Sequence, residues 1–225
     1  MFSLRYDSAF EINPMTKDES KFRSSVRISM HEYFLEIALA SYEVYQKLFD
    51  NLKLHKDKGG FLHEEGGAQQ FFYHEHSKVF QYEQEITVEI IKAVVFLNMY
   101  CEAYIWDLGA SVLGDSYAKK HLDKLDTLSK WVVIPRLLFG KSIDPGHHGL
   151  GSLKELIKWR NDFVHSKSKD GINLLRAPEN YPKELVPLEE QIFLKAIFEG
   201  IRDLFIELDK TDPGNSHYLN MKRGI

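Results

Sequence analysis

Apolar residues recur at three- and four-residue spacing along most of the chain, which is the pattern of helices that bury one face. No sustained alternation of apolar and polar residues indicates a sheet. The pattern predicts an all-α, up-and-down bundle of about five main helices, preceded by an N-terminal arm. The predicted helices cover about Ser29 to Leu54, Tyr82 to Val112, Tyr117 to Leu138, Ser152 to His165 and Leu188 to Asp209.

Glycine, proline and capping residues set the expected helix limits. The segment HKDKGGFLHEEGGAQQ separates the first two helices, and Gly114 stops the second. Pro135 interrupts the third predicted helix. The fourth is expected to open at Ser152, whose hydroxyl caps the helix, with Glu155 three residues later completing a capping box.

Composition bounds the classes of protein that fit this pattern. A chain of 225 residues, 44% of them hydrophobic, is long enough to bury the core of one domain, so residues 1–225 are expected to form a single unit. The formal net charge of -4 excludes broad, charge-driven nucleic-acid binding and leaves room for a local basic patch.

Cys101 is the only cysteine, so no intramolecular disulfide forms. The N-terminus lacks the features of a signal peptide, and no long apolar run predicts a membrane span. We therefore expect a cytoplasmic protein without a membrane anchor.

Two charged residues interrupt apolar helix faces. At about 100° per residue, Arg160 falls near the middle of an apolar arc in LIKWRNDFVH. Glu102 falls at the centre of an arc that holds Ile91, Val95, Ile105, Trp106 and Gly109. A charge on a core-facing position is costly unless it is paired, which predicts that Arg160 and Glu102 meet. One interpretation of such a pair is structural, an ion pair that fixes the register of two helices.

The other interpretation is chemical, because His165 lies on the same helix as Arg160 and next to Asn161 on its surface. Histidine transfers protons near neutral pH, and the arginine guanidinium stabilises negative charge on a phosphate. Together they supply what cleavage of an RNA phosphodiester needs, without a metal or another cofactor. Asn161 would orient the histidine or hold a phosphate oxygen.

A local excess of basic residues surrounds this group. From Ser152 to Lys169 the chain carries five Lys or Arg and two acidic residues. Lys158, Lys167 and Lys169 are candidate contacts to an RNA backbone. A charged helix end is also a common solvated surface, so this feature alone does not decide between the interpretations.

The run RNDFVH, Arg160 to His165, resembles the motif of the HEPN superfamily (higher eukaryotes and prokaryotes nucleotide-binding domain). In that family an arginine is followed by a polar residue and, a few positions later, by a histidine near the end of a late bundle helix. An earlier helix carries an acidic or amide residue that faces the motif, for which Glu102 is the candidate. The resemblance covers about residues 71–209 and leaves the arm and extra helix in 1–54 unassigned.

The resemblance implies a compact all-α homodimer in which two motifs share one cleft. Catalytic members are metal-independent endoribonucleases of toxin–antitoxin, antiviral or stress-response systems, whose partners include antitoxins and regulatory proteins. Many relatives lack activity and bind RNA or proteins. The sequence therefore leaves two functions open, an endoribonuclease and a non-catalytic binding module.

A third function, a metal-dependent hydrolase, rests on a histidine-rich segment. His63, His74 and His76 stand near Glu64, Glu65 and Glu75, but their spacing matches no zinc signature. A surface loop is the simpler interpretation. His147 and His148 lie in a glycine-rich stretch with no evident carboxylate partner in the sequence.

Overall fold

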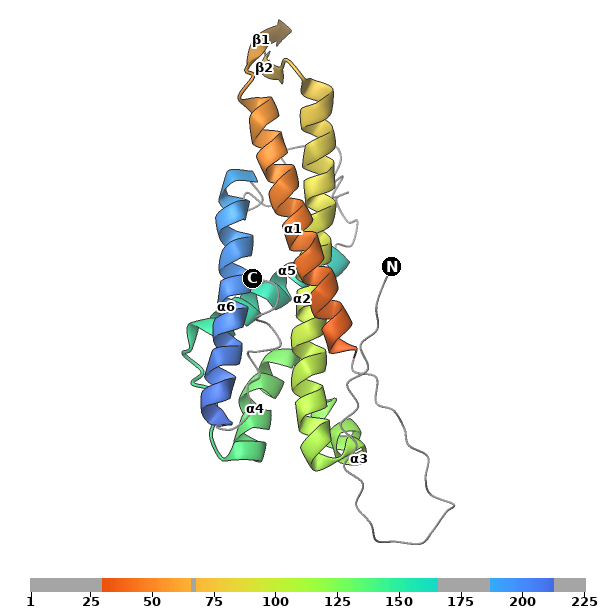
Figure 1. Ribbon diagram of the computed structural model, residues 1–225, viewed down its shortest axis with the longest axis vertical. Coiled ribbons are helices and arrows are strands. Elements are labelled where there is room, and N and C mark those ends of the chain that lie inside the picture. Colours follow the sequence, from red (N-terminus) through yellow and green to blue (C-terminus); the bar gives the residue numbers. More distant parts are fainter. Residues whose placement is uncertain (1–29, 66–67, 166–186, 213–225) are drawn as a thin grey trace, which may run out of the picture.

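The computed structural model describes residues 30–65, 68–165 and 187–212 and shows a bundle of long helices (Figure 1). This confirms the all-α architecture predicted from the sequence. The elements are α1 (His31–Lys56), β1 (Gly60–Glu65), β2 (Ala68–Tyr73), α2 (His76–Leu113), α3 (Asp115–Tyr117), the short π-helix η1 (Ala118–Leu122), α4 (Thr127–Phe139), α5 (His148–His165) and α6 (Pro187–Thr211).

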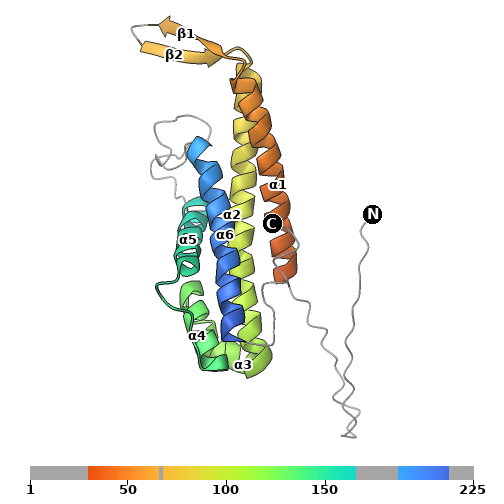
Figure 2. The same ribbon diagram turned by 60° about the vertical axis from the view of Figure 1, so that its left-hand side comes forward.

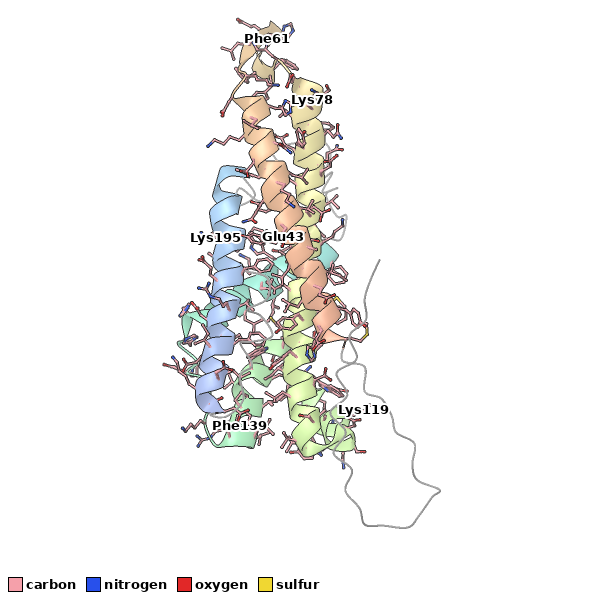
Figure 3. All side chains as sticks on the ribbon, viewed as in Figure 1. Glu43, Phe61, Lys78, Lys119, Phe139 and Lys195 are labelled. Atoms are coloured by element: carbon pink, nitrogen blue, oxygen red, sulfur yellow. The ribbon has the colours of Figure 1, made fainter. Side chains whose placement is uncertain are left out.

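Helices α1 and α2 form an antiparallel pair, and α6 runs beside them (Figure 1). Helices α4 and α5 lie on the other side of α2 and α6 from α1 (Figure 2). Side chains fill the space between α6 and the α1–α2 pair (Figure 3). The bundle thus has α2 and α6 at its centre, which is why these two helices carry most of the fully buried residues.

An aromatic cluster joins the central helices. The Phe205 ring of α6 lies 5.2 Å from Tyr100 and 4.8 Å from Tyr104 of α2, and 5.0 Å from Trp131 of α4, measured between ring centroids. The indole N–H of Trp131 donates to the main-chain carbonyl of Cys101 at 3.1 Å. The cluster therefore holds three helices together and satisfies its one buried indole donor.

The two strands form a hairpin at the tip of the α1–α2 pair, where the sequence pattern predicted no strand (Figure 1). Phe61 pairs with Phe72 and Leu62 with Phe71 in antiparallel register. The prediction was wrong because both faces of this short ribbon carry aromatic or aliphatic residues, which hides the apolar–polar alternation of a half-buried strand. Gly59, at φ 78°, provides the left-handed backbone that leads from α1 into β1.

The third predicted helix is broken into shorter pieces. Gly114 ends α2 with φ 87°, α3 and η1 follow, and a new helix, α4, starts after Asp126. The Asp126 carboxylate accepts from the backbone N–H of Ser129 at 2.9 Å, which is the hydrogen bond of a helix N-cap. Donation by the hydroxyl and N–H of Ser129 lowers the pKa of Asp126. Pro135 lies inside α4 and does not end it.

Helix α5 begins at His148, so the predicted start at Ser152 was wrong. Ser152 instead packs against α6, where a Cβ added at Gly200 would overlap its side chain. A glycine is needed there because the two helices approach closely. Further along, Trp159 stacks on Phe193 with ring centroids 4.1 Å apart, so α5 and α6 are antiparallel neighbours.

Candidate functional site

The motif residues lie in the last described turns of α5 (His148–His165). Arg160 is half-buried, and its Nη1 donates to the side-chain Oδ1 of the exposed Asn161 at 3.0 Å. Lys158 is exposed on the same helix. The side chain of His165, and Lys167 and Lys169 entirely, lie outside the described residues. The described part of the site is therefore a guanidinium held by the amide that follows it in the chain.

The predicted ion pair between Arg160 and Glu102 is absent, and that prediction was wrong. Glu102 is 49% exposed, and its Oε1 accepts from Nζ of Lys130 at 3.3 Å. The Lys130 side chain is only 5% exposed. The buried charge that needs a partner is thus the ammonium of Lys130 on α4. The sequence pattern did not identify this residue.

The packing of α6 explains why Arg160 and Glu102 do not meet. Trp159, next to Arg160 in the chain, stacks on Phe193, whereas the tyrosines two positions either side of Glu102 contact Phe205. These two phenylalanines lie about 18 Å apart along α6 at 1.5 Å per residue. The two charged residues therefore sit at different levels of the bundle.

Glu102 was wrongly predicted to face the core because α2 has apolar residues on two sides. The buried side holds Val94, Leu97 and Cys101, each at most 1% exposed. The arc in which Glu102 sits is buried at Ile105 and Gly109 but only half-buried at Ile91, Val95 and Trp106. A helix wheel alone does not tell which apolar side faces the core.

A groove of about 390 Å³ lies beside Glu102, between the start of α1, α2 and α4. Sequence reasoning missed it because its residues come from distant segments without a common motif. His31 Nδ1 lies 2.9 Å from Asp107 Oδ2, and the Trp106 indole N–H donates to Asp123 Oδ1 at 2.5 Å. The groove thus combines acidic, basic and aromatic side chains, including Phe34, Glu102, Trp106, Asp107, Asp123 and Lys130.

Replacing Glu102 with alanine is expected to lower the free energy of unfolding by about 1–3 kcal/mol, because the buried ammonium of Lys130 loses its carboxylate. The effect is below that of a fully buried pair, since half of Glu102 is exposed. Urea denaturation of the single variant and of Glu102→Ala/Lys130→Met measures it. The double variant should recover to within about 1 kcal/mol of the wild type. A single variant as stable as the wild type would contradict the assignment.

The histidine-rich segment does not form a metal site within the described residues, where no group of three or more His, Cys, Asp or Glu side chains is placed to hold a metal ion. His63 and His74 lie against the phenylalanine rings of the hairpin. The carboxylate of Glu75 is hydrogen-bonded to His55 and Lys58, and these donors lower its pKa to about 2. Glu75 is therefore already engaged in holding the base of the hairpin.

His147 and His148, at the start of α5, do have carboxylate partners, which the sequence did not reveal. His148 Nε2 lies 2.9 Å from Asp203 Oδ2, and His147 Nε2 lies 3.8 Å from Glu207 Oε2. Both carboxylates belong to α6, one helical turn apart. These contacts fix the start of α5 on α6 and so help to set the level of the motif in the bundle.

Comparison of the chain with models of protein families, with curated proteins and with solved structures finds no match. In the part of the chain that the structure describes, no helix combines the length and apolar character needed to span a membrane.

Proposed function

We propose that the chain is a HEPN-like, metal-independent endoribonuclease that acts at the end of α5. The observation that carries the proposal is the hydrogen bond from Arg160 to Asn161, on the helix that ends at His165. This hydrogen bond holds the guanidinium of Arg160, a planar donor suited to phosphate oxygens. Arg160 lies about one and a half helical turns before His165, which carries the imidazole.

In this proposal His165 transfers the proton to or from the RNA oxygens, and Arg160 stabilises the charge that develops on the phosphate. Asn161 positions Arg160. Lys158, Lys167 and Lys169 attract the RNA backbone. Glu102 has no part in the reaction, because it pairs with Lys130 at another level of the bundle.

The proposal includes the setting that the resemblance implies. The protein acts in the cytoplasm as a homodimer, in a toxin–antitoxin, antiviral or stress-response system, with an antitoxin or regulatory protein to control it. RNA is the substrate, and no cofactor takes part.

A second candidate function is a non-catalytic binding module. It is favoured by apolar side chains exposed on α1, among them Tyr33 (47% exposed) and Val44 (42% exposed), since such surfaces mark interaction sites. A module predicts partner capture or self-association by the purified protein without RNA cleavage. The metal-dependent hydrolase gains no support from the described residues.

The experiment is an RNA cleavage assay with the full chain in excess chelator. The wild type is expected to cleave mixed RNAs, and His165→Ala to lose about 100-fold or more of the rate, the usual contribution of a general acid or base. Both proteins should have the same melting temperature. Full activity of a folded His165→Ala variant would remove the histidine from the mechanism, and activity that the chelator abolishes would favour a metal-dependent reaction.

A further inference from the structure

The groove beside Glu102 has a buried cation at its floor. It lies between the start of α1, α2 and α4, on the half of the bundle where α2 ends (Figure 1). The Lys130 side chain is 5% exposed and that of Glu102 is 49% exposed, so Lys130 lies at the floor and Glu102 at the rim. The groove is therefore built on a charge that the fold keeps almost entirely out of water.

The ammonium of Lys130 has hydrogen-bond donors to spare. A lysine ammonium carries three N–H donors. Among the described residues only Glu102 accepts from Nζ, at 3.3 Å, which is longer than a strong charged hydrogen bond. A nearly buried donor without an acceptor is costly, so this position favours a ligand that brings oxygen acceptors to Lys130.

Carboxylates surround the mouth of the groove. Asp107 and Asp123 line it together with Glu102. Asp123 is exposed, and its Oδ1 accepts from the indole N–H of Trp106 at 2.5 Å. A carboxylate accepts at about four lone-pair positions, so this hydrogen bond leaves Asp123 able to accept from a ligand as well. The rim therefore favours a positively charged donor.

The remaining lining of the groove is apolar. Met30 precedes α1 and Phe34 lies in its first turn, whereas Ala103 and Trp106 belong to α2. The volume of about 390 Å³ lies in the lower part of the range of small-molecule sites, about 300–1,000 Å³. The groove thus has room for an apolar group of the size of a large amino-acid side chain.

This combination of charges excludes simpler ligands. A plain anion would be repelled by the three carboxylates, and a plain cation would meet the ammonium of Lys130 at the floor. A ligand with both charges on one carbon atom and an apolar body satisfies all three parts of the lining.

We infer that the groove binds a free α-amino acid with a large apolar side chain. The ligand carboxylate accepts from Lys130, and the ligand ammonium donates to Asp123. The ligand side chain lies against Phe34 and Trp106. A residue inside a peptide chain lacks both charges, so the ligand is the free amino acid.

This inference goes beyond the proposed function and is independent of the motif. The groove lies at the level of Glu102, whereas the motif lies near Phe193, and these levels differ by about 18 Å along α6 at 1.5 Å per residue. The binding test below contains no RNA. Its failure therefore leaves the cleavage proposal untouched, and a chain that cleaves no RNA can still bind the amino acid.

The fluorescence of Trp106 follows binding to the full chain, because Trp106 lines the groove whereas Trp131 and Trp159 are buried in the core. Titration with L-phenylalanine up to about 10 mM should change the emission, with a dissociation constant on the order of 0.1–1 mM. Trp106→Phe should lose this change and still show a ligand-induced rise in melting temperature, since any ligand of the native state stabilises it.

Two truncated analogues separate the contributions of the two ligand charges. Phenethylamine lacks the carboxylate, and 3-phenylpropionate lacks the ammonium. Each should bind at least about 10-fold more weakly than L-phenylalanine, which is the effect of losing one charged hydrogen bond.

Variants of the groove should reproduce this separation. Lys130→Met should weaken L-phenylalanine about 10-fold and should not weaken phenethylamine. Asp123→Asn keeps an acceptor for Trp106, and it should weaken L-phenylalanine and phenethylamine but not 3-phenylpropionate. Lys195→Met, at a lysine on α6 that is 65% exposed, is the matched control and should bind as the wild type does.

No binding of L-phenylalanine in this range would overturn the inference. Equal affinity for phenethylamine and L-phenylalanine would also overturn it, as would full affinity of a folded Lys130→Met variant. This variant is expected to fold, because Glu102, which loses its partner, is half exposed. Circular dichroism checks this, and if the variant does not fold, the analogue series on the wild-type chain decides.

Discussion

Replacing Arg160 with alanine is expected to lower the rate of RNA cleavage about 100- to 1,000-fold, the usual effect of removing one group that stabilises transition-state charge. The guanidinium is held by Asn161 at 3.0 Å, so its position is set before RNA binds. Arg160→Lys keeps the charge and loses the planar donor fork, and it should also be strongly impaired. Initial rates on a single RNA, measured below saturation, give the effect.

Arg136→Ala is the matched control for this variant. Arg136 lies in the last turn of α4 and donates to the main-chain carbonyl of Gly140 at 2.6 Å, so its removal also deletes one arginine near a helix end. It should leave the cleavage rate unchanged. Because Arg160 is half-buried, circular dichroism must show that its variants are folded. A folded Arg160→Ala variant with the wild-type rate would exclude the guanidinium from the reaction.

Replacing Phe205 with alanine is expected to cost about 3–5 kcal/mol of unfolding free energy, the range for removing a large aromatic side chain from a core. The ring is fully buried and contacts aromatic rings of α2 and α4, so its removal leaves a cavity in a close-packed core. Urea denaturation followed by circular dichroism measures the loss.

The control for this second prediction is Phe80→Ala, which removes the same side chain from a position that is 46% exposed on α2. Its cost should stay near 0.5 kcal/mol or less, as is usual for surface substitutions. If the two variants lost equal stability, Phe205 would not be part of the core that joins the helices. A large loss at Phe205 alone supports the central place of α6.

The long helices were predictable because each has a continuous apolar face. The limits of α1 and α6 lie within about two residues of the prediction, as expected when a periodic pattern is long. The start of α5 was not predictable from Ser152, since that residue is fixed by its contact with Gly200 on another helix. Tertiary contact here overrides a local capping signal.

The hairpin had a signal that the helical pattern concealed. A run with Phe61 and Leu62 precedes the pair Gly66-Gly67 in the sequence, and the aromatic run Phe71 to Tyr73 follows it; apolar runs on either side of Gly-Gly are a hairpin signature. The segment was interpreted as a break because neither run alternates cleanly. A two-stranded ribbon with apolar residues on both faces has no single buried side to produce that alternation.

Of the candidate site, the residues on one helix were predictable and the partner from another helix was not. Arg160, Asn161 and His165 follow from local spacing, which fixes their relation in α5. Predicting whether Glu102 meets Arg160 requires knowing which apolar side of α2 faces the core. It also requires knowing at which level of the bundle α5 packs on α2. Neither is encoded in the spacing of a single helix. For the same reason the groove around Lys130 left no trace in the sequence.

We propose that RNA is cleaved at the end of α5 by a metal-independent attack of its own 2′-hydroxyl. The most direct measurement is the chemistry of the new ends produced by the wild-type chain in chelator. We expect 2′,3′-cyclic phosphate and 5′-hydroxyl ends, and a substrate that carries a 2′-deoxy sugar at the cleaved position should resist cleavage. Products with 3′-hydroxyl and 5′-phosphate ends, or cleavage of the deoxy substrate at the same position, would contradict it.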